Sequence, residues 1–151
     1  MVVSILIGSQ SDKAVIEKTA EVLKEFGVPF EIHVTSAHRT PDKTRRIIEE
    51  SVRNGTKIFI AAAGLAAHLA GMVAAHTDLP VIGVPMEGGP LNGMDSLLST
   101  VQMPGGVPVA SMAIGAAGAK NAGYMAVRIL ALSDESLAKK HRAYIKSLSE
   151  S

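Results

Sequence analysis

The sequence predicts an α/β fold built on a parallel sheet, because short apolar strands alternate along the chain with single helices. The first strand, at residues 2–8, is apolar except at Ser4 and Gly8, which is typical of a central strand buried on both faces. The next helix ends at Gly27, a residue suited to a helix C-terminus. Its apolar side chains form one stripe, made of Ile16, Ala20, Leu23 and Phe26.

Five strands are expected, at residues 2–8, 30–35, 57–61, 79–84 and 108–114. Later helices are expected at 41–53, from 68 to about 76, and at 93–101, 117–132 and 134–148. With right-handed crossovers, five strands fit a flavodoxin-like, doubly wound three-layer αβα sandwich with the strand order 2-1-3-4-5. No linker or internal repeat interrupts the chain, so residues 1–151 are expected to form a single domain.

The second strand and the helix after it frame the most informative loop. The strand at 30–35 is expected to be buried, and Thr40 and Pro41 are expected to be the N-cap and the first residue of the helix. Asn54 and Gly55 are expected to close that helix. The side chains that it is expected to turn inward are Ile47, Ile48 and Val52.

The composition excludes several classes of protein. Hydrophobic residues make up 47% of the chain and charged residues 19%, so disorder is not expected. The formal net charge of +1 gives no reason to expect nucleic acid as a partner. The absence of cysteine excludes disulfides, thiolate metal sites and a cysteine nucleophile. No signal peptide and no apolar run of membrane-spanning length is found, so a cytoplasmic protein without a membrane partner is expected.

Small side chains are unusually common in the second half of the chain. Aromatic residues make up only 3%, while Gly, Ala and Met are abundant between residues 61 and 131. Small side chains let helices and backbones approach closely, within a subunit or between subunits. We therefore expect the chain to form an oligomer.

The loop at 36–41 is the strongest candidate for a catalytic site. It follows a strand and precedes a helix, and open parallel sheets bind ligands at the carboxyl ends of their strands. Ser36, His38 and Arg39 stand together there. An imidazole exchanges a proton near neutral pH, and a guanidinium fork suits a phosphate. The alternatives are a surface histidine and an arginine that pairs with Asp42.

The turn at 8–12 has the composition of a phosphate site. Ser9 and Ser11 supply hydroxyls beside the amides of a helix N-terminus, and the Asp12 carboxylate can hold ribose hydroxyls. Neither a Walker loop nor a dinucleotide-binding turn matches the turn. Serine and aspartate are also common helix caps, so a purely structural role stays open.

A third loop, at 62–68, is almost wholly small and apolar until it reaches His68. It either packs a helix N-terminus tightly onto the sheet or forms a dry pocket for a small uncharged molecule. Neither His68 nor His38 has further ligands at metal-binding spacing, so no metal is expected. The histidines expected to be structural or solvated are His33, His76 and His141.

Taken together, these loops resemble class I of the PurE family of purine biosynthesis. The resemblance covers essentially the whole chain, and it is carried by residues 8–12, 36–41, 64–69, 91–99, 101–104 and 119–122. Class I members are isomerases that move a carboxylate from the exocyclic nitrogen of N5-carboxyaminoimidazole ribonucleotide to carbon 4 of its imidazole. The resemblance implies this step of IMP biosynthesis, a ribonucleotide substrate, no ATP, metal or organic cofactor, and a homo-octamer with sites at subunit contacts.

The resemblance also implies roles for single residues. His38 matches the family's catalytic histidine, a general acid and base, and His68 matches a histidine at the carboxylate end of the pocket. The matched phosphate and ribose contacts are Ser9, Ser11, Arg39 and Asp12. The residues implied to line the base site and a pocket for CO2 are Ser36, Ala37, Ala63, Gly64 and Leu69.

The chain departs from the family's usual pattern where Ala62, Leu65 and Ala70 replace Gly, Gly and Pro. These changes are expected to alter the width of the pocket or the stiffness of the loop. The chain also ends at Ser151, so a C-terminal segment that some members place near a neighbouring site is expected to be shorter.

Two other functions remain alternatives. One is class II of the same family, which carboxylates aminoimidazole ribonucleotide directly with CO2. His68 and the residues at 36–41 favour class I, because class II departs from the pattern at both. The other is a non-catalytic nucleotide-binding module, which would tolerate the loss of His38.

Overall fold

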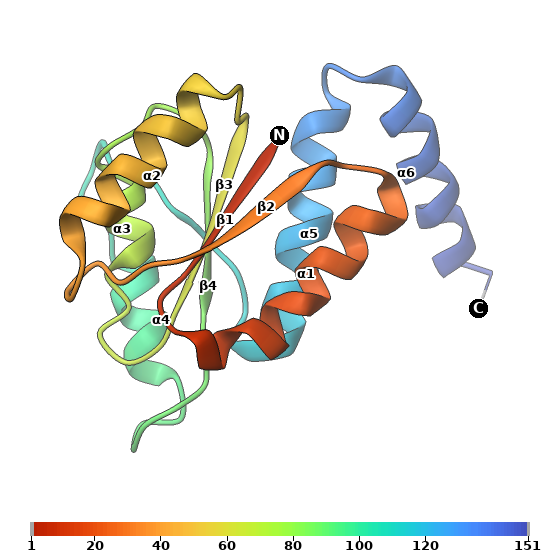
Figure 1. The fold of residues 1–151 in the computed structure, drawn as a ribbon. Helices are drawn as coiled ribbons and strands as arrows, with labels where there is room; N and C mark the ends of the chain where they lie inside the picture. Colours follow the sequence, from red (N-terminus) through yellow and green to blue (C-terminus); the bar gives the residue numbers. More distant parts are fainter. Residues whose placement is uncertain (1, 151) are drawn as a thin grey trace.

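A computed structural model, which describes residues 2–150, confirms the predicted sheet. Five parallel strands lie in the order β2-β1-β3-β4-β5, with helices on both faces (Figure 1). The strands are β1 (Val3–Ile7), β2 (Phe30–Val34), β3 (Ile58–Ala63), β4 (Val81–Pro85) and β5 (Ala110–Ser111). The helices are α1 (Lys13–Phe26), α2 (Pro41–Arg53), α3 (Leu69–Ala74), α4 (Met94–Val101), α5 (Gly115–Ala131) and α6 (Glu135–Leu148). Met1 and Ser151, the ends of the predicted domain, lie outside the described residues.

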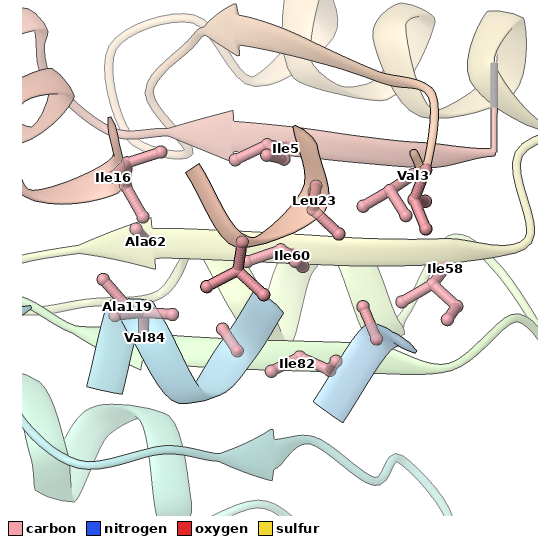
Figure 2. Packing of buried hydrophobic residues seen from close by; sticks show 14 of the residues in the cluster. Val3, Ile5, Ile16, Leu23, Ile58, Ile60, Ala62, Ile82, Val84 and Ala119 are labelled. Atoms are coloured by element: carbon pink, nitrogen blue, oxygen red, sulfur yellow. The ribbon is translucent and has the colours of Figure 1, made fainter. Parts of the chain in front are cut away.

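Side chains that alternate along the central strands build a core on each face of the sheet. On the face covered by α1 and α5, Ile5, Ile60 and Ile82 belong to one buried cluster (Figure 2). On the opposite face, Leu6 and Phe59 pack with α2 and α3. Burial on both faces explains why β1 and β3 are almost uninterrupted apolar runs.

The first helix matches its prediction closely. All four side chains of its predicted stripe are buried, and Gly27 ends it with a φ of +72°, where its N–H donates to the carbonyls of Leu23 and Lys24. Glycine adopts this left-handed conformation without strain. The apolar spacing and the glycine therefore defined this helix correctly.

Both edges of the sheet differ from the prediction. The strand expected at 30–35 is not buried, because β2 is an edge strand, and its Val34 side chain is 38% exposed. The strand expected at 108–114 shrinks to β5, which pairs with β4 only at Ala110 and Ser111. The two faces of a strand and its place in the sheet depend on distant neighbours, which local sequence does not reveal.

The inward face of α2 is also partly different from the prediction. Ile48 is fully buried, but Val52 is 41% exposed. The buried position in the last turns is taken instead by Ser51, whose hydroxyl hydrogen-bonds the buried hydroxyl of Ser4 at 3.1 Å. The hydrogen-bonded pair of Ser4 in β1 and Ser51 in α2 thus takes the inward position that the prediction gave to Val52.

The remaining differences are small shifts of element ends. The third strand extends to Ala63 rather than residue 61, and the helix expected to reach about residue 76 ends at Ala74. The fourth strand runs from Val81 to Pro85 rather than over 79–84. Within residues 2–150, no helix combines the length and the apolar character needed to cross a membrane.

Candidate active site

A cleft of about 630 Å³ lies at the carboxyl edge of the sheet, where the loops after β1, β2, β3 and β4 meet. Open α/β sheets bind ligands at this edge, and the volume is in the range of small-molecule sites. The structure brings the three predicted loops to one place, while the roles of their residues stay predictions. All the site residues named from the sequence line the cleft: Ser9, Ser11, Asp12, Ser36, Ala37, His38, Arg39, Ala63, Gly64, His68 and Leu69.

The loop after β1 is folded by its own polar side chains. Ser9 is the N-cap of a short 3-10 helix at Gln10–Asp12. Its hydroxyl accepts from the backbone N–H of Ser11 at 3.3 Å, and its own N–H donates to Asp12 Oδ2 at 3.1 Å. These bonds form a capping box, so the structural role that the sequence left open is present. The same residues line the cleft, and capping does not exclude ligand binding.

Partial burial gives Asp12 an unusual titration. Loss of solvent raises the pKa of its carboxyl above the ordinary value of 3.8, against the lowering effect of hydrogen bonds from Ser11 and Ser9. A carboxyl with a raised folded-state pKa destabilises the fold when it is ionised. That cost is fully present above the folded pKa and disappears as pH falls below the unfolded value.

We therefore expect Asp12→Asn to unfold at a higher temperature than the wild type near neutral pH. Asparagine keeps an oxygen that accepts from the Ser9 N–H but carries no charge to desolvate. The difference is expected to vanish as pH falls below about 4, where the unfolded carboxyl is protonated as well. Thermal unfolding of both proteins over this pH range measures it. A variant that unfolds at a lower temperature near neutral pH would contradict the expectation.

A network of threonine hydroxyls holds the loop after β2. The Oγ1 of buried Thr35 lies 2.7 Å from that of Thr44 in α2 and 3.3 Å from that of Thr40. Thr40 is the N-cap residue as predicted, but its side chain does not cap the helix. Instead, its Oγ1 accepts from the Ser36 N–H at 3.1 Å and donates to the Ser36 carbonyl at 3.2 Å. The network fixes the backbone on both sides of His38.

Two histidines from neighbouring loops meet in the cleft. His38 Nε2 lies 2.8 Å from His68 Nδ1, with the rings inclined at 78°. In such a contact one nitrogen carries the proton and the other accepts it, so both rings cannot be imidazolium in this arrangement. The pair can hold one extra proton and present it to a ligand. The sequence placed both rings in the site but gave no sign that they touch.

Arg39 keeps most of its donors available. Its Nη2 donates to the carbonyl of Gly8 at 3.4 Å, and its backbone N–H donates to Ser36 Oγ at 3.2 Å. The alternative pairing with Asp42 is absent, and no carboxylate of residues 2–150 forms an ion pair with Arg39. The exposed guanidinium thus lies beside the serine loop with most of its N–H groups ready for an anion.

The loop after β3 forms the apolar part of the cleft. Ala63 and Gly64 are half-buried, Leu69 is almost fully buried, and His68 is the polar side chain among them. Leu65 has a φ of +56°, a left-handed conformation that costs a non-glycine residue about 1 kcal/mol. A glycine here would carry no such strain, and the effect of this departure on the loop stays a prediction.

Sequence reasoning missed the contribution of the loop after β4. This loop extends past the carboxyl ends of the strands (Figure 1), and Glu87, Gly88 and Gly89 line the cleft. Its place after a parallel strand was the available signal, since all such loops meet at one edge. The cleft is also lined by Gly8, Leu65 and Ala66, which belong to the predicted loops but were not named as site residues.

The other histidines lie outside this cleft. His76 Nδ1 is 2.8 Å from the Met72 carbonyl, and His33 Nε2 is buried without a hydrogen-bond partner. Burial, and then the charge of Arg128, lower the pKa of His141. Among residues 2–150, no three His, Asp or Glu side chains gather as a metal site would require.

Comparisons with known proteins agree with this geometry. A family model described as AIR carboxylase matches residues 2–151. N5-carboxyaminoimidazole ribonucleotide mutase of Bacillus subtilis is 56% identical over 91% of this chain and 85% of the relative. The enzyme of the same name from Saccharolobus solfataricus is 51% identical over 98% of this chain and 90% of the relative. Treponema denticola PurE superposes with a TM-score of 0.89 at 30% identity, covering 99% of this chain and 92% of that one. The chain therefore belongs to the AIR carboxylase (PurE) family.

Proposed function

We propose that this chain is an N5-carboxyaminoimidazole ribonucleotide mutase, a carboxylate-shifting isomerase. The observation that carries the proposal is the 2.8 Å contact between His38 and His68, which both line the cleft. Two side chains able to carry a proton thus share the cleft with a loop of phosphate-binding composition and with an apolar wall. The names of relatives at 51–56% identity support the same activity.

The substrate lies across the cleft with its phosphate at the loop after β1. Hydroxyls of Ser9 and Ser11 and the guanidinium of Arg39 bind the phosphate. The Asp12 carboxylate accepts from ribose hydroxyls. Ser36 and Ala37 contact the imidazole, which places the reacting carboxylate near His38 and His68.

The reaction moves one carboxylate through free CO2 within the cleft. The bond between the exocyclic nitrogen and the carboxylate carbon breaks, its electron pair stays on nitrogen, and His38 supplies a proton to that nitrogen. Carbon 4 then attacks the CO2 carbon to form a new C–C bond, and His38 takes up the proton that carbon 4 loses. One proton is given and one is recovered, so the net change is an isomerisation. General acid–base catalysis of this kind contributes about 10²–10⁴-fold.

The apolar side of the cleft keeps the intermediate in place. CO2 is uncharged, so it is not held by the groups that bind phosphate. The apolar wall formed by Ala63, Gly64 and Leu69 leaves room for CO2 beside carbon 4 and offers few polar groups to water. Holding the two fragments together provides the entropic advantage that free CO2 in solution lacks.

A pair of parallel assays separates the proposal from its two alternatives. One offers N5-carboxyaminoimidazole ribonucleotide without added bicarbonate, and the other offers aminoimidazole ribonucleotide with CO2, both without ATP or metal. Fast conversion in the first alone supports the mutase. Efficient conversion in the second at low CO2 contradicts it in favour of a class II carboxylase. No conversion in either, with ligand still bound, contradicts it in favour of a binding module.

We also propose a homo-octamer that works in the cytoplasm. Support for the oligomer comes from α4 and the turn before it, whose apolar side chains are about half exposed. These are Leu91 (59%), Met94 (52%), Leu98 (49%) and Val101 (46%). Exposed apolar residues at helical spacing are typical of subunit contacts, and a sedimentation measurement tests the number of subunits.

A further inference from the structure

Leu65 has an unusual backbone for its residue type. Within residues 2–150, the non-glycine residues at positive φ are Leu65, at +56°, and Asn92, at +48°. Asparagine adopts this conformation readily because its side chain bonds locally, whereas leucine gains no such bond. A strained residue of this kind persists only where its surroundings hold it, and such residues cluster at functional sites. Leu65 lies in the wall of the cleft.

The Leu65 side chain fills a space that Gly89 leaves empty. A Cβ added to Gly89 would lie 2.5 Å from Leu65 Cδ2, closer than two carbon atoms can pack. Gly89 itself has a φ of +65°. The large residue after β3 and the glycine after β4 are thus complementary, and they join two loops that are otherwise separate in sequence.

The glycines of this loop have few other contacts: the Asn92 N–H donates to the Gly89 carbonyl at 3.4 Å, and Asp95 Oδ2 would lie 3.9 Å from a Cβ at Gly89. A Cβ added to Gly88 would have no atom within 4 Å, and its φ is +150°. Two consecutive glycines give a backbone with wide conformational freedom. The contact with Leu65 restricts that freedom at Gly89.

We propose that Leu65 is a positioning residue that holds the loop at 87–89 across the cleft and limits the escape of CO2. This inference rests on the proposed mutase function and deepens it. Leu65 is 54% exposed and lines the cleft together with Ala63 and Gly64, so its aliphatic side chain adds an apolar wall on the solvent side of the pocket that CO2 must pass to reach water. Leu65 touches none of the reacting atoms, so its effect falls on the fate of the intermediate rather than on proton transfer.

The test measures how often the intermediate is lost. For each turnover of N5-carboxyaminoimidazole ribonucleotide, the released aminoimidazole ribonucleotide is divided by the carboxylated product, after subtraction of uncatalysed decarboxylation. We expect Leu65→Gly to raise this ratio about fivefold, which corresponds to about 1 kcal/mol of lost restraint. We expect Leu65→Asn to do the same, because asparagine tolerates the backbone but lacks the apolar wall. Neither variant is expected to unfold at a lower temperature, since both relieve the backbone strain.

A matched control is Leu132→Ala, which removes a leucine that is 88% exposed at the end of α5. Its ratio is expected to equal that of the wild type. An unchanged ratio in both Leu65 variants, with the wild type forming product, overturns the inference and leaves the proposed function intact. If the wild type forms no product, the proposed function fails, and the CO2 role of Leu65 fails with it.

A double-mutant cycle tests the contact without substrate. Gly89→Ala introduces the Cβ that meets Leu65 and is expected to lower the unfolding free energy. Part of that cost is the left-handed φ of +65° at residue 89, which both backgrounds share. In the Leu65→Gly background the obstructing side chain is gone, so the same substitution is expected to cost less. Equal costs in the two backgrounds would show that Leu65 does not hold Gly89, and would also overturn the inference.

Discussion

Replacing His38 with asparagine is expected to abolish turnover while the ligand still binds. Asparagine keeps a hydrogen-bonding group near His68 but cannot exchange a proton at neutral pH. In the proposed mechanism His38 serves both half-reactions, so kcat is expected to fall by at least the factor of about 10²–10⁴ usual for a lost general acid or base. Initial rates give kcat, and calorimetry with the carboxylated product gives the binding affinity.

A second histidine variant provides the control. His76→Asn changes a ring that lies outside the cleft and contacts the Met72 carbonyl, so turnover is expected to match the wild type. Retained turnover in His38→Asn would exclude His38 as the proton carrier. Loss of binding together with turnover would instead make it a structural or binding residue.

Replacing Arg39 with alanine is expected to weaken the binding of phosphate-bearing ligands about 10–100-fold. Hydrogen bonds to a charged group contribute about 1.5–3 kcal/mol, and Arg39 has no carboxylate partner among the described residues to compete for its donors. The effect is expected mainly in KM rather than kcat, because the phosphate does not change during the reaction.

The phosphate dependence is tested by comparing the ribonucleotide with its dephosphorylated nucleoside. Arg39→Ala is expected to change the affinity for the nucleoside little. Arg45→Ala, which removes an exposed arginine 3.8 Å from Glu49 on α2, is expected to change neither affinity. An unchanged affinity of Arg39→Ala for the ribonucleotide, or an equal loss with both ligands, would refute the phosphate role.

The central sheet and the position of the cleft could be predicted because they depend on local patterns. Apolar strands such as 2–8 alternate with helices that each have one apolar stripe. A parallel sheet covered by helices is the arrangement that buries all of these apolar surfaces. In such a sheet all the loops that follow the strands lie at the same edge, the one formed by the carboxyl ends of the strands. The resemblance to the PurE family implied that the residues of three loops share one site, and this common edge is the physical reason why they can.

What could not be predicted depends on contacts between distant segments. The contact between His38 and His68 joins residues 30 positions apart, and neither loop alone contains a signal for it. Thr35 and Thr44 are ordinary residues in sequence, yet their hydroxyls help to shape the loop that carries His38. The length of β5 likewise depends on its pairing with β4, which involves only Ala110 and Ser111 of β5.

The central claim, that the carboxylate of the product is the one the substrate brought, is tested most directly by isotope retention. Substrate labelled with carbon-13 in its N-carboxylate is converted in a large excess of unlabelled bicarbonate, and the carboxylate at carbon 4 of the product is analysed by mass spectrometry. The account predicts that nearly all product carries the label, because CO2 stays within the cleft between the two steps. Product with the isotope content of the bicarbonate would contradict it, since the carboxylate would then come from solution.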